Sequence, residues 1–319
     1  MFLPRAVTPK LISLAKKFPV VVVTGPRQSG KTTLVIAAFP HHEYVSLEDP
    51  DLRLQAQDDP RGFLEDHGGS VILDEVQRAP SLLSYIQTRV DRKERHGQYI
   101  LTGSQNILLQ SQVSQTLAGR AAYVTVLPFS LGELGARKMA PLESLVWRGF
   151  YPRLHAQKLT PGEWFPNYIR TYVERDVREI RNIGNLATFQ KFLKLCAGRT
   201  GQLVNASSLA SDCGINYQTA LSWISVLEAS YIIFQLRPHH ANLNKRLIKA
   251  PKLYFHETGL ACSLLGIRSA SELKSHFLWG GLFENFVASE LVKAAHHAGR
   301  EPSVFFWRDK TGHEVDFLV

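Results

Sequence analysis

The sequence is poor in cysteine and has no long hydrophobic run. Its 319 residues include three cysteines, Cys196, Cys213 and Cys262, and no C-x-x-C pair joins any of them. Isolated cysteines are typical of small buried side chains in a protein from a reducing compartment. They are not the pattern of a disulfide framework or a zinc site. No apolar run reaches the length of a membrane span, and residues 1–18 lack the apolar core of a signal peptide. We therefore expect a cytoplasmic protein without a membrane partner.

Acidic residues are in the minority. Lys and Arg number 37 against 28 Asp and Glu, which gives a formal net charge of +9. A basic balance attracts polyanions and makes nucleic acid the leading candidate partner, although a nucleotide site also requires basic groups. At this length the chain can hold two or three domains with their own cores.

One stretch carries the clearest signal. Four consecutive valines, residues 20–23, predict a strand buried on both faces, and residues 33–38 predict a helix. The segment between them matches G-x-x-x-x-G-K-[ST], the phosphate-binding loop, in the context that this motif requires. Its glycines let backbone N–H groups point at phosphate oxygens, and the helix dipole adds to the attraction. The predicted nucleotide-binding residues are Gly25, Pro26, Arg27, Gln28, Ser29, Gly30, Lys31, Thr32 and Thr33.

The loop residues have different expected roles. Lys31 is expected to reach the β- and γ-phosphates, and the Thr32 hydroxyl to ligate Mg²⁺. The ligand that this predicts is ATP or ADP with Mg²⁺. A chance glycine turn before a helix is the alternative, and the flanking strand and helix argue against it.

A second strand ends in two carboxylates. Residues 71–75 read Val-Ile-Leu-Asp-Glu, which is the Walker B pattern. We expect Asp74 to hold Mg²⁺ through water and Glu75 to polarise the attacking water. Glu75 favours an ATPase over a small-molecule kinase, because a kinase does not need a water-activating acid here. A strand that happens to end in an acidic turn is the alternative.

Two further residues are candidates for catalysis. Residues 99–102 predict a strand that ends in hydroxyl and amide groups, among which Ser104 is the best candidate to orient the water. Ser104 is equally suited to cap a following helix, so both interpretations stay open. Arg120 precedes a further expected strand, residues 122–127, where a guanidinium can stabilise transition-state charge in cis or across a subunit interface.

Five motifs follow one another in the chain: Gly25–Thr33, Leu73–Pro80, Leu101–Ser104, Leu117–Arg120 and Leu127–Ser130. Together they resemble the bacterial and archaeal AAA-type ATP-binding proteins that carry a nuclease-like C-terminal domain of unknown function. The resemblance covers essentially the whole chain. It implies an α/β fold with an ASCE-type P-loop NTPase core, a parallel sheet in which Lys31, Thr32, Asp74 and Glu75 have the roles given above.

The segment after the core carries two further patterns. Trp147–Pro152 resembles the lid motif of related ATPases, and a Gly-Pro turn with an aromatic packing contact is the alternative. Residues 206–229 predict two helices joined by a turn at Gly214, the helix-turn-helix pattern. In the second helix we expect Leu221 to face inward and Trp223 to lie on another face.

Residues 231–236 and 252–255 predict the strands of a wing, which would complete a winged-helix domain. The second helix has no Arg or Lys, so we expect DNA to be held mostly through its phosphates. Docking of a protein partner is the alternative. The basic residues expected to contact DNA from the wing are Lys245, Arg246, Lys249 and Lys252.

The last segment resembles part of a nuclease. A helix glutamate, Glu284, followed by a strand aspartate, Asp316, resembles the opening of a PD-(D/E)XK nuclease site, in which both would ligate a metal. That site also requires an acid-x-Lys sequence on the next strand, and the sequence ends three residues after Asp316. We therefore expect a truncated or degenerate nuclease-like domain that does not cleave DNA.

The predicted organisation has four parts. They are a P-loop ATPase core (1–130), lid and linker helices (131–185), a winged-helix domain (186–255) and a partial restriction-endonuclease-like α/β domain (256–319). We predict an ATPase that couples hydrolysis to rearrangement of a DNA-binding winged helix, with a second copy or another protein as a further partner. The alternatives are a nucleotide-gated binding module with little turnover and a degenerate metal-dependent nuclease.

Overall fold

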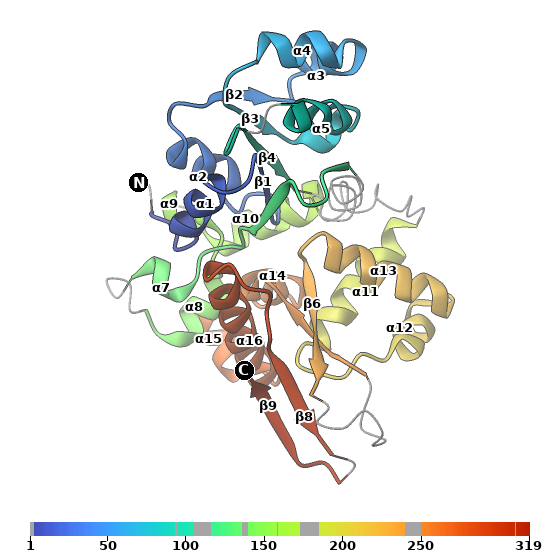
Figure 1. Ribbon diagram of the computed structural model, residues 1–319. Helices are drawn as coiled ribbons and strands as arrows, with labels where there is room; N and C mark the ends of the chain where they lie inside the picture. Colours follow the sequence, from blue (N-terminus) through green and yellow to red (C-terminus); the bar gives the residue numbers. More distant parts are fainter. Residues whose placement is uncertain are drawn as a thin grey trace. The chain divides into compact units, whose positions relative to one another are not determined.

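The computed structural model describes residues 3–92, 95–104, 116–135, 140–157, 159–172, 185–239, 250–309 and 311–319. The chain forms two compact units (Figure 1). The N-terminal unit consists of residues 3–127 and 296–300, and the C-terminal unit of residues 128–295 and 301–319.

The N-terminal unit is built on a parallel sheet of five strands in the order β2-β3-β4-β1-β5. The strands are β1 (Val20–Thr24), β2 (Glu43–Ser46), β3 (Val71–Asp74), β4 (Tyr99–Gly103) and β5 (Ala121–Thr125). The helices are α1 (Thr8–Ala15), α2 (Lys31–Ala38), α3 (Pro50–Asp58), α4 (Pro60–Asp66), the 3₁₀ helix η1 (Val76–Arg78) and α5 (Leu82–Arg92). Because β4 lies between β1 and β3, the loop after β1 and the carboxylates at the end of β3 flank the end of β4.

Both faces of this sheet are buried. Along β1, Val20 and Val22 belong to one apolar cluster, and Val21 and Val23 belong to another. The first cluster includes side chains of α3, α4 and α5, and the second includes side chains of α1 and α2. Four consecutive valines therefore form a strand covered on both sides, as expected for a parallel sheet with helices on each face.

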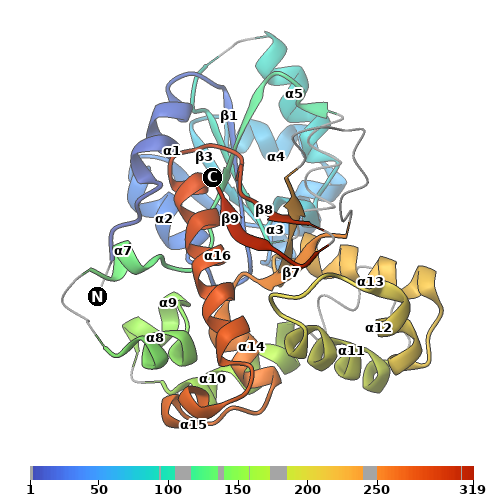
Figure 2. The same ribbon diagram turned by 90° about the horizontal axis from the view of Figure 1, so that it is seen from below.

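The C-terminal unit contains mainly helices and a second, smaller sheet. The helices are α7 (Leu131–Leu134), α8 (Leu142–Arg148), α9 (Pro152–Ala156), α10 (Pro161–Tyr168), α11 (Leu186–Gly198), α12 (Ala206–Cys213), α13 (Tyr217–Ala229), α14 (Thr258–Leu264), α15 (Ala270–Ser275) and α16 (Trp279–His297). The strands β6 (Ile233–Pro238), β7 (Lys252–Phe255), β8 (Phe305–Arg308) and β9 (Glu314–Leu318) lie in the order β7-β6-β8-β9. Figure 2 shows α11, α12 and α13 grouped together, beside the long helix α16 and this sheet.

The second sheet joins segments that the sequence assigns to different domains. The two expected wing strands pair antiparallel as β6 and β7. On its other edge β6 pairs with β8, and β8 pairs antiparallel with β9. Strands from both sides of the expected boundary at residue 255 thus form one sheet. Residues 240–249, which include three of the four expected DNA-contacting basic residues, lie outside the described residues.

The helix-turn-helix segment has the expected turn, and the buried face of its second helix differs from the expected one at two positions. Gly214 ends α12 in the left-handed conformation, with φ 67° and ψ 34°, and Asn216 caps α13. The expectation for α13 is wrong at two positions, because Trp223 is buried and Leu221 is exposed. Residues two apart on a helix point to nearly opposite sides, and the aromatic side chains of α11 cover the Trp223 side. Phe189 and Phe192 meet the Trp223 ring edge-on, with centroids 5.3 and 5.2 Å away.

Two expectations from composition concern cysteines and membrane spans. All three cysteines are buried free thiols, as predicted. Within the residues that the structure describes, no helix is both long enough and apolar enough to cross a bilayer.

Candidate active site

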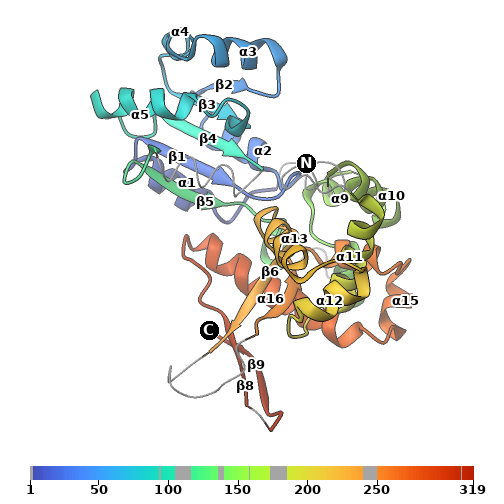
Figure 3. The same ribbon diagram turned by 90° about the vertical axis from the view of Figure 1, so that its right-hand side faces the viewer.

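The loop after β1 fits closely against the end of β5. Gly25 has φ 144°, and a Cβ atom added there would lie 2.1 Å from the carbonyl oxygen of Val126. Gly30 is left-handed and forms the N-cap of α2. A larger residue therefore cannot replace Gly25 without displacing the loop, and Gly30 has a backbone conformation that glycine adopts most readily. Figure 3 shows β1, β3 and β4 running in the same direction, so this loop and the residues after β3 share one edge of the sheet.

Lys31 is buried within this loop. Its Nζ donates to the carbonyl oxygens of Gly25 and Pro26 at 3.0 and 2.9 Å. Burial lowers the pKa of Lys31 to about 8, and the carboxylates of Glu75 and Asp74 offset part of that effect. An anionic phosphate beside Nζ would restore the charged form, because an opposite charge favours ionisation.

Asp74 is surrounded by hydroxyl groups. Thr32 Oγ1 lies 3.2 Å from both of its carboxylate oxygens, and Tyr44 donates its hydroxyl to Oδ2 at 2.8 Å. Thr102 also donates to Oδ1. The structure thus brings together Thr32 and Asp74, the two residues predicted to hold Mg²⁺. Carboxylate and hydroxyl oxygens are hard ligands of the kind that Mg²⁺ takes beside a phosphate, so these residues fit the ion.

Glu75 follows β3 in a left-handed conformation, with φ 56° and ψ 46°. Its Oε2 accepts a hydrogen bond from Ser104 Oγ at 2.9 Å and a second one from Gln77 Nε2. Ser104 is therefore placed beside the predicted water-activating carboxylate. The alternative role of Ser104, capping a helix, concerns residues 105–115, which lie outside the described residues.

Sequence analysis missed several supports of this site. The buried guanidinium of Arg5 donates to the carbonyl oxygens of Ser29 and Leu127, at 2.7 and 2.6 Å, and so ties the loop to the end of β5. Sequence analysis gave Tyr44 no role. Nothing in the sequence indicates either contact, because both depend on segments that meet only in the folded sheet.

A basic pair lies beside the loop. Glu48 Oε1 is 3.0 Å from Nη2 of Arg27 and 3.8 Å from Nη2 of Arg78. Arg27 belongs to the phosphate-binding loop and Arg78 to the turn after the Walker B strand. One carboxylate thus meets two guanidinium groups, one from the loop and one from the turn after the Walker B strand.

The region that contains this site matches a known protein family. Residues 17–135 match the model of the AAA domain. They form an AAA-type P-loop domain. Residues 139–271 match a domain of unknown function (DUF8612), and residues 279–319 match another (DUF4143). The expected nuclease-like domain has no further support from these matches and stays a prediction, as does the winged helix.

The chain is also similar to two curated proteins and to a solved structure. Two proteins, from Mycobacterium bovis and Mycobacterium tuberculosis, both named as uncharacterised, are 29% identical over 312 residues, which are 94% of this chain and 67% of each relative. The Walker-type ATPase of Pyrococcus abyssi superposes with a TM-score of 0.54 and 15% identity, over 82% of this chain and 96% of its own. At that identity the likeness concerns the fold, which is that of a P-loop NTPase.

Arg120 lies at the surface of the AAA domain. Its Nη2 donates to Asp91 Oδ2 at 3.0 Å, its Nε contacts the other oxygen of the same carboxylate, and Nη1 donates to the Ala118 carbonyl oxygen at 3.0 Å. The structure therefore places Arg120 in a local ion pair with Asp91. Its role toward a nucleotide stays a prediction.

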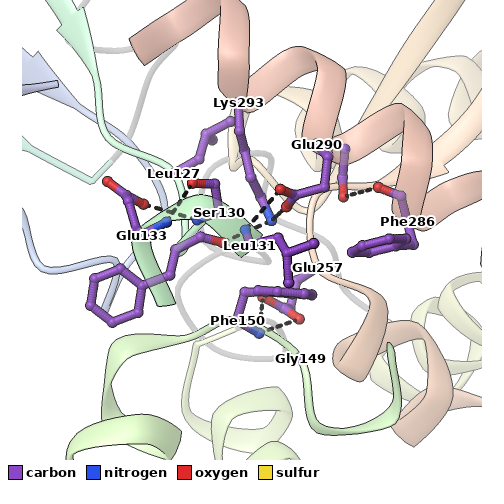
Figure 4. A network of polar contacts seen from close by, with 12 residues as sticks. Leu127, Ser130, Leu131, Glu133, Gly149, Phe150, Glu257, Phe286, Glu290 and Lys293 are labelled. Atoms are coloured by element: carbon purple, nitrogen blue, oxygen red, sulfur yellow. Dashed lines mark hydrogen bonds and ion pairs between the residues drawn. The ribbon is translucent and has the colours of Figure 1, made fainter. Parts of the chain in front are cut away.

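The expected lid segment is packed within the C-terminal unit. Glu257 accepts the backbone N–H of Phe150 at 2.9 and 3.0 Å, and Gly149 leaves room for this carboxylate, since a Cβ there would lie 2.1 Å from Oε1. Lys293 lies with Nζ 4.2 Å from the centre of the Phe150 ring (Figure 4). The ring also stacks on Phe286. These are contacts of the kind that the packing alternative predicts, and placement against a nucleotide stays a prediction.

Lys293 and its neighbour Glu290 also contact the segment that follows β5 in the chain. Lys293 Nζ donates to the carbonyl oxygen of Phe129 at 3.0 Å and to Glu290 Oε1 at 2.9 Å. Glu290 Oε2 in turn accepts the backbone N–H of Leu131 at 2.8 Å (Figure 4). A buried ammonium and its carboxylate neighbours therefore fix residues 129–131 and 149–150 to α16 and α14.

The two predicted nuclease ligands come together with an unexpected cation. Oxygens of Glu284, Glu314 and Asp316 lie within 4.8 Å of one another. Lys252 Nζ is 2.7 Å from Glu284 Oε1 and 3.3 Å from Asp316 Oδ1, and it also contacts Glu314. Burial lowers the pKa of Lys252, but the hydrogen bonds to Glu284 and Glu314 outweigh burial and raise it. Lys252 is therefore a charged group inside this cluster.

This position corrects the DNA-contact role expected for Lys252. The residue is 3% exposed, and its ammonium is paired with carboxylates. Sequence analysis placed it on a basic wing because its partners come from α16 and β9, which lie far along the chain.

Proposed function

We propose that the protein is a Mg²⁺-dependent ATPase in which Glu75 activates water for attack on the γ-phosphate of ATP. The AAA domain and the likeness to a Walker-type ATPase support ATP binding. One observation carries the step to hydrolysis. Glu75 lies directly after Asp74, the predicted Mg²⁺ ligand, and Ser104 holds its carboxylate at 2.9 Å.

Each residue then has a defined task. Lys31 binds the β- and γ-phosphates as a point charge, and the glycine-rich loop supplies N–H donors. When bound, Mg²⁺ would neutralise the charge that develops on the phosphates. Thr32 and Asp74 hold that ion, Glu75 accepts the proton of the attacking water, and Ser104 orients this carboxylate.

A nucleotide-gated binding module is the second candidate. The buried network around Lys293 supports it, because within the C-terminal unit it holds residues 129–131, which follow the last strand of the parallel sheet in the chain, against α16. In such a protein, ATP would change domain arrangement with little turnover. The two candidates share the nucleotide site and differ in the rate of phosphate release.

DNA remains the proposed partner of the C-terminal unit. The net charge of +9 and the helix–turn–helix pair α12–α13 support it. Phosphate contacts would make the binding salt-dependent, with a log–log slope of roughly −0.9 for each phosphate neutralised. Fluorescence anisotropy with unrelated duplexes at several salt concentrations measures that slope. No binding at low salt would favour a protein partner instead.

The ATPase proposal is tested by steady-state phosphate release with and without Mg²⁺, together with ATP affinity by calorimetry. We expect Mg²⁺-dependent turnover in the wild type and loss of ATP binding in Lys31→Ala, because that change removes the charge that faces the phosphates. Equal ATP affinity of wild type and Lys31→Ala would refute the nucleotide site. ATP binding without turnover would favour the gated module.

A further inference from the structure

Glu75 uses its two carboxylate oxygens differently. Oε2 accepts hydrogen bonds from Ser104 Oγ, 2.9 Å away, and from Gln77 Nε2. Within the described residues, no donor contacts Oε1. One oxygen therefore anchors the carboxylate, and the other has no protein partner in that part of the chain.

Gln77 reaches this carboxylate because of the backbone conformation. In a regular helix, residues i and i+2 point to different sides. Glu75 is instead left-handed, and the 3₁₀ helix η1 follows at once, so the chain turns back on itself and Arg78 N donates to Glu75 O at 3.0 Å. A left-handed conformation is unfavourable for a non-glycine residue. Such strain persists where the surroundings fix it, as at catalytic sites.

The amide of Gln77 is oriented by what it contacts. An ionised carboxylate only accepts hydrogen bonds, so the amide nitrogen faces Oε2 of Glu75. The amide oxygen, Oε1, is left buried and without a hydrogen-bond partner among the described residues. A buried acceptor without a hydrogen bond destabilises the folded state. Two unfavourable features, the left-handed backbone of Glu75 and the unpaired amide oxygen of Gln77, thus accompany a fixed position of the Glu75 side chain.

We propose that Gln77 is a positioning residue of the hydrolytic site. Together with Ser104 it holds Oε2 of Glu75 and leaves Oε1 as the oxygen that takes a proton from the attacking water. The water oxygen bonds to the γ-phosphorus, its proton passes to Oε1, and ADP leaves with the electron pair of the broken P–O bond. This inference rests on the proposed function, because it requires Glu75 to be the general base.

Two substitutions of similar size test this role. Gln77→Leu removes the hydrogen-bond donor, and Gln77→Glu keeps the length of the side chain but places a second carboxylate against Glu75. We expect kcat to fall roughly 10–100-fold in both, the range for a misplaced catalytic group, with KM and ATP affinity changed less than about twofold. Unchanged ATP affinity also shows that the variants fold. Gln57→Ala is the control, because Gln57 braces the same turn through the Arg78 carbonyl oxygen at 2.8 Å and makes no contact with Glu75. It should keep the wild-type kcat.

A double-mutant cycle separates positioning from a general structural role. In a Glu75→Gln background the side chain that Gln77 positions is no longer a base, so adding Gln77→Leu should lower single-turnover hydrolysis of radiolabelled ATP by less than about twofold. The same loss in both backgrounds would overturn the inference, as would a wild-type kcat in Gln77→Leu. If Glu75→Gln itself hydrolyses ATP at the wild-type rate, the proposed function fails first.

Discussion

Glu257→Gln should remove a pH dependence from the stability of the C-terminal unit. Burial raises the pKa of Glu257 from its ordinary value of 4.5 to about 7, and the Lys293 charge and the N–H groups of Gly259 and Phe150 offset part of that effect. The folded state therefore holds the proton more tightly than the unfolded state. This contribution is fully present below pH 4.5 and is lost as pH rises through about 7.

The magnitude follows from the size of the shift. Each pKa unit corresponds to about 1.4 kcal/mol, so the wild type should lose about 2–3 kcal/mol relative to Glu257→Gln between pH 5 and pH 8. With a urea m-value of about 2 kcal/mol per molar, the difference between their unfolding midpoints should change by about 1 M. Glutamine suits the site because its Oε1 can still accept the N–H groups of Phe150 and Gly259.

Tryptophan fluorescence measures this unit selectively, because every tryptophan of the chain lies in it. They are Trp147, Trp164, Trp223, Trp279 and Trp307. Glu163→Gln is the matched control. Glu163 is an exposed capping carboxylate whose pKa is lowered by hydrogen bonds from Thr160, so its contribution changes only as pH falls below 4.5. A wild-type-minus-Glu257→Gln difference that stays constant from pH 5 to pH 8 would refute the reasoning.

Two further predictions concern the phosphate-binding loop. ATP affinity should fall about tenfold between pH 7 and pH 9, because the pKa of Lys31 is about 8 and only the charged form attracts phosphate. Calorimetric titrations measure this change. In the Lys31→Arg variant the side chain stays charged, so the pH dependence should be lost. Gly25→Ala should weaken ATP binding roughly 5–150-fold, the equivalent of about 1–3 kcal/mol of overpacking, since its Cβ would lie 2.1 Å from the Val126 carbonyl oxygen. Gly119→Ala, also left-handed but with no atom within 4 Å of the added Cβ, should keep the wild-type affinity. An equal loss in both glycine variants would contradict the steric account.

Sequence patterns predicted the core because its signals are local. Four valines and a glycine motif specify a buried strand and its loop, and parallel strands bring Asp74 to Thr32. The role of Gln77 was not predictable, because it depends on a left-handed residue just before it. Lys252 and Trp223 were misplaced for a different reason. Lys252 is buried against α16, which lies far along the chain, and Trp223 is buried against the neighbouring helix α11. The spacing of apolar residues within one element does not reveal such neighbours.

The most direct test of the account compares phosphate release by wild type and Glu75→Gln in single-turnover experiments with Mg²⁺ and saturating ATP. The account predicts equal ATP affinity and a hydrolysis rate lower by roughly 10²–10⁴-fold in Glu75→Gln, the usual loss when a general base is removed. A Glu75→Gln protein that binds ATP and hydrolyses it at the wild-type rate would contradict the assignment of Glu75 as the base.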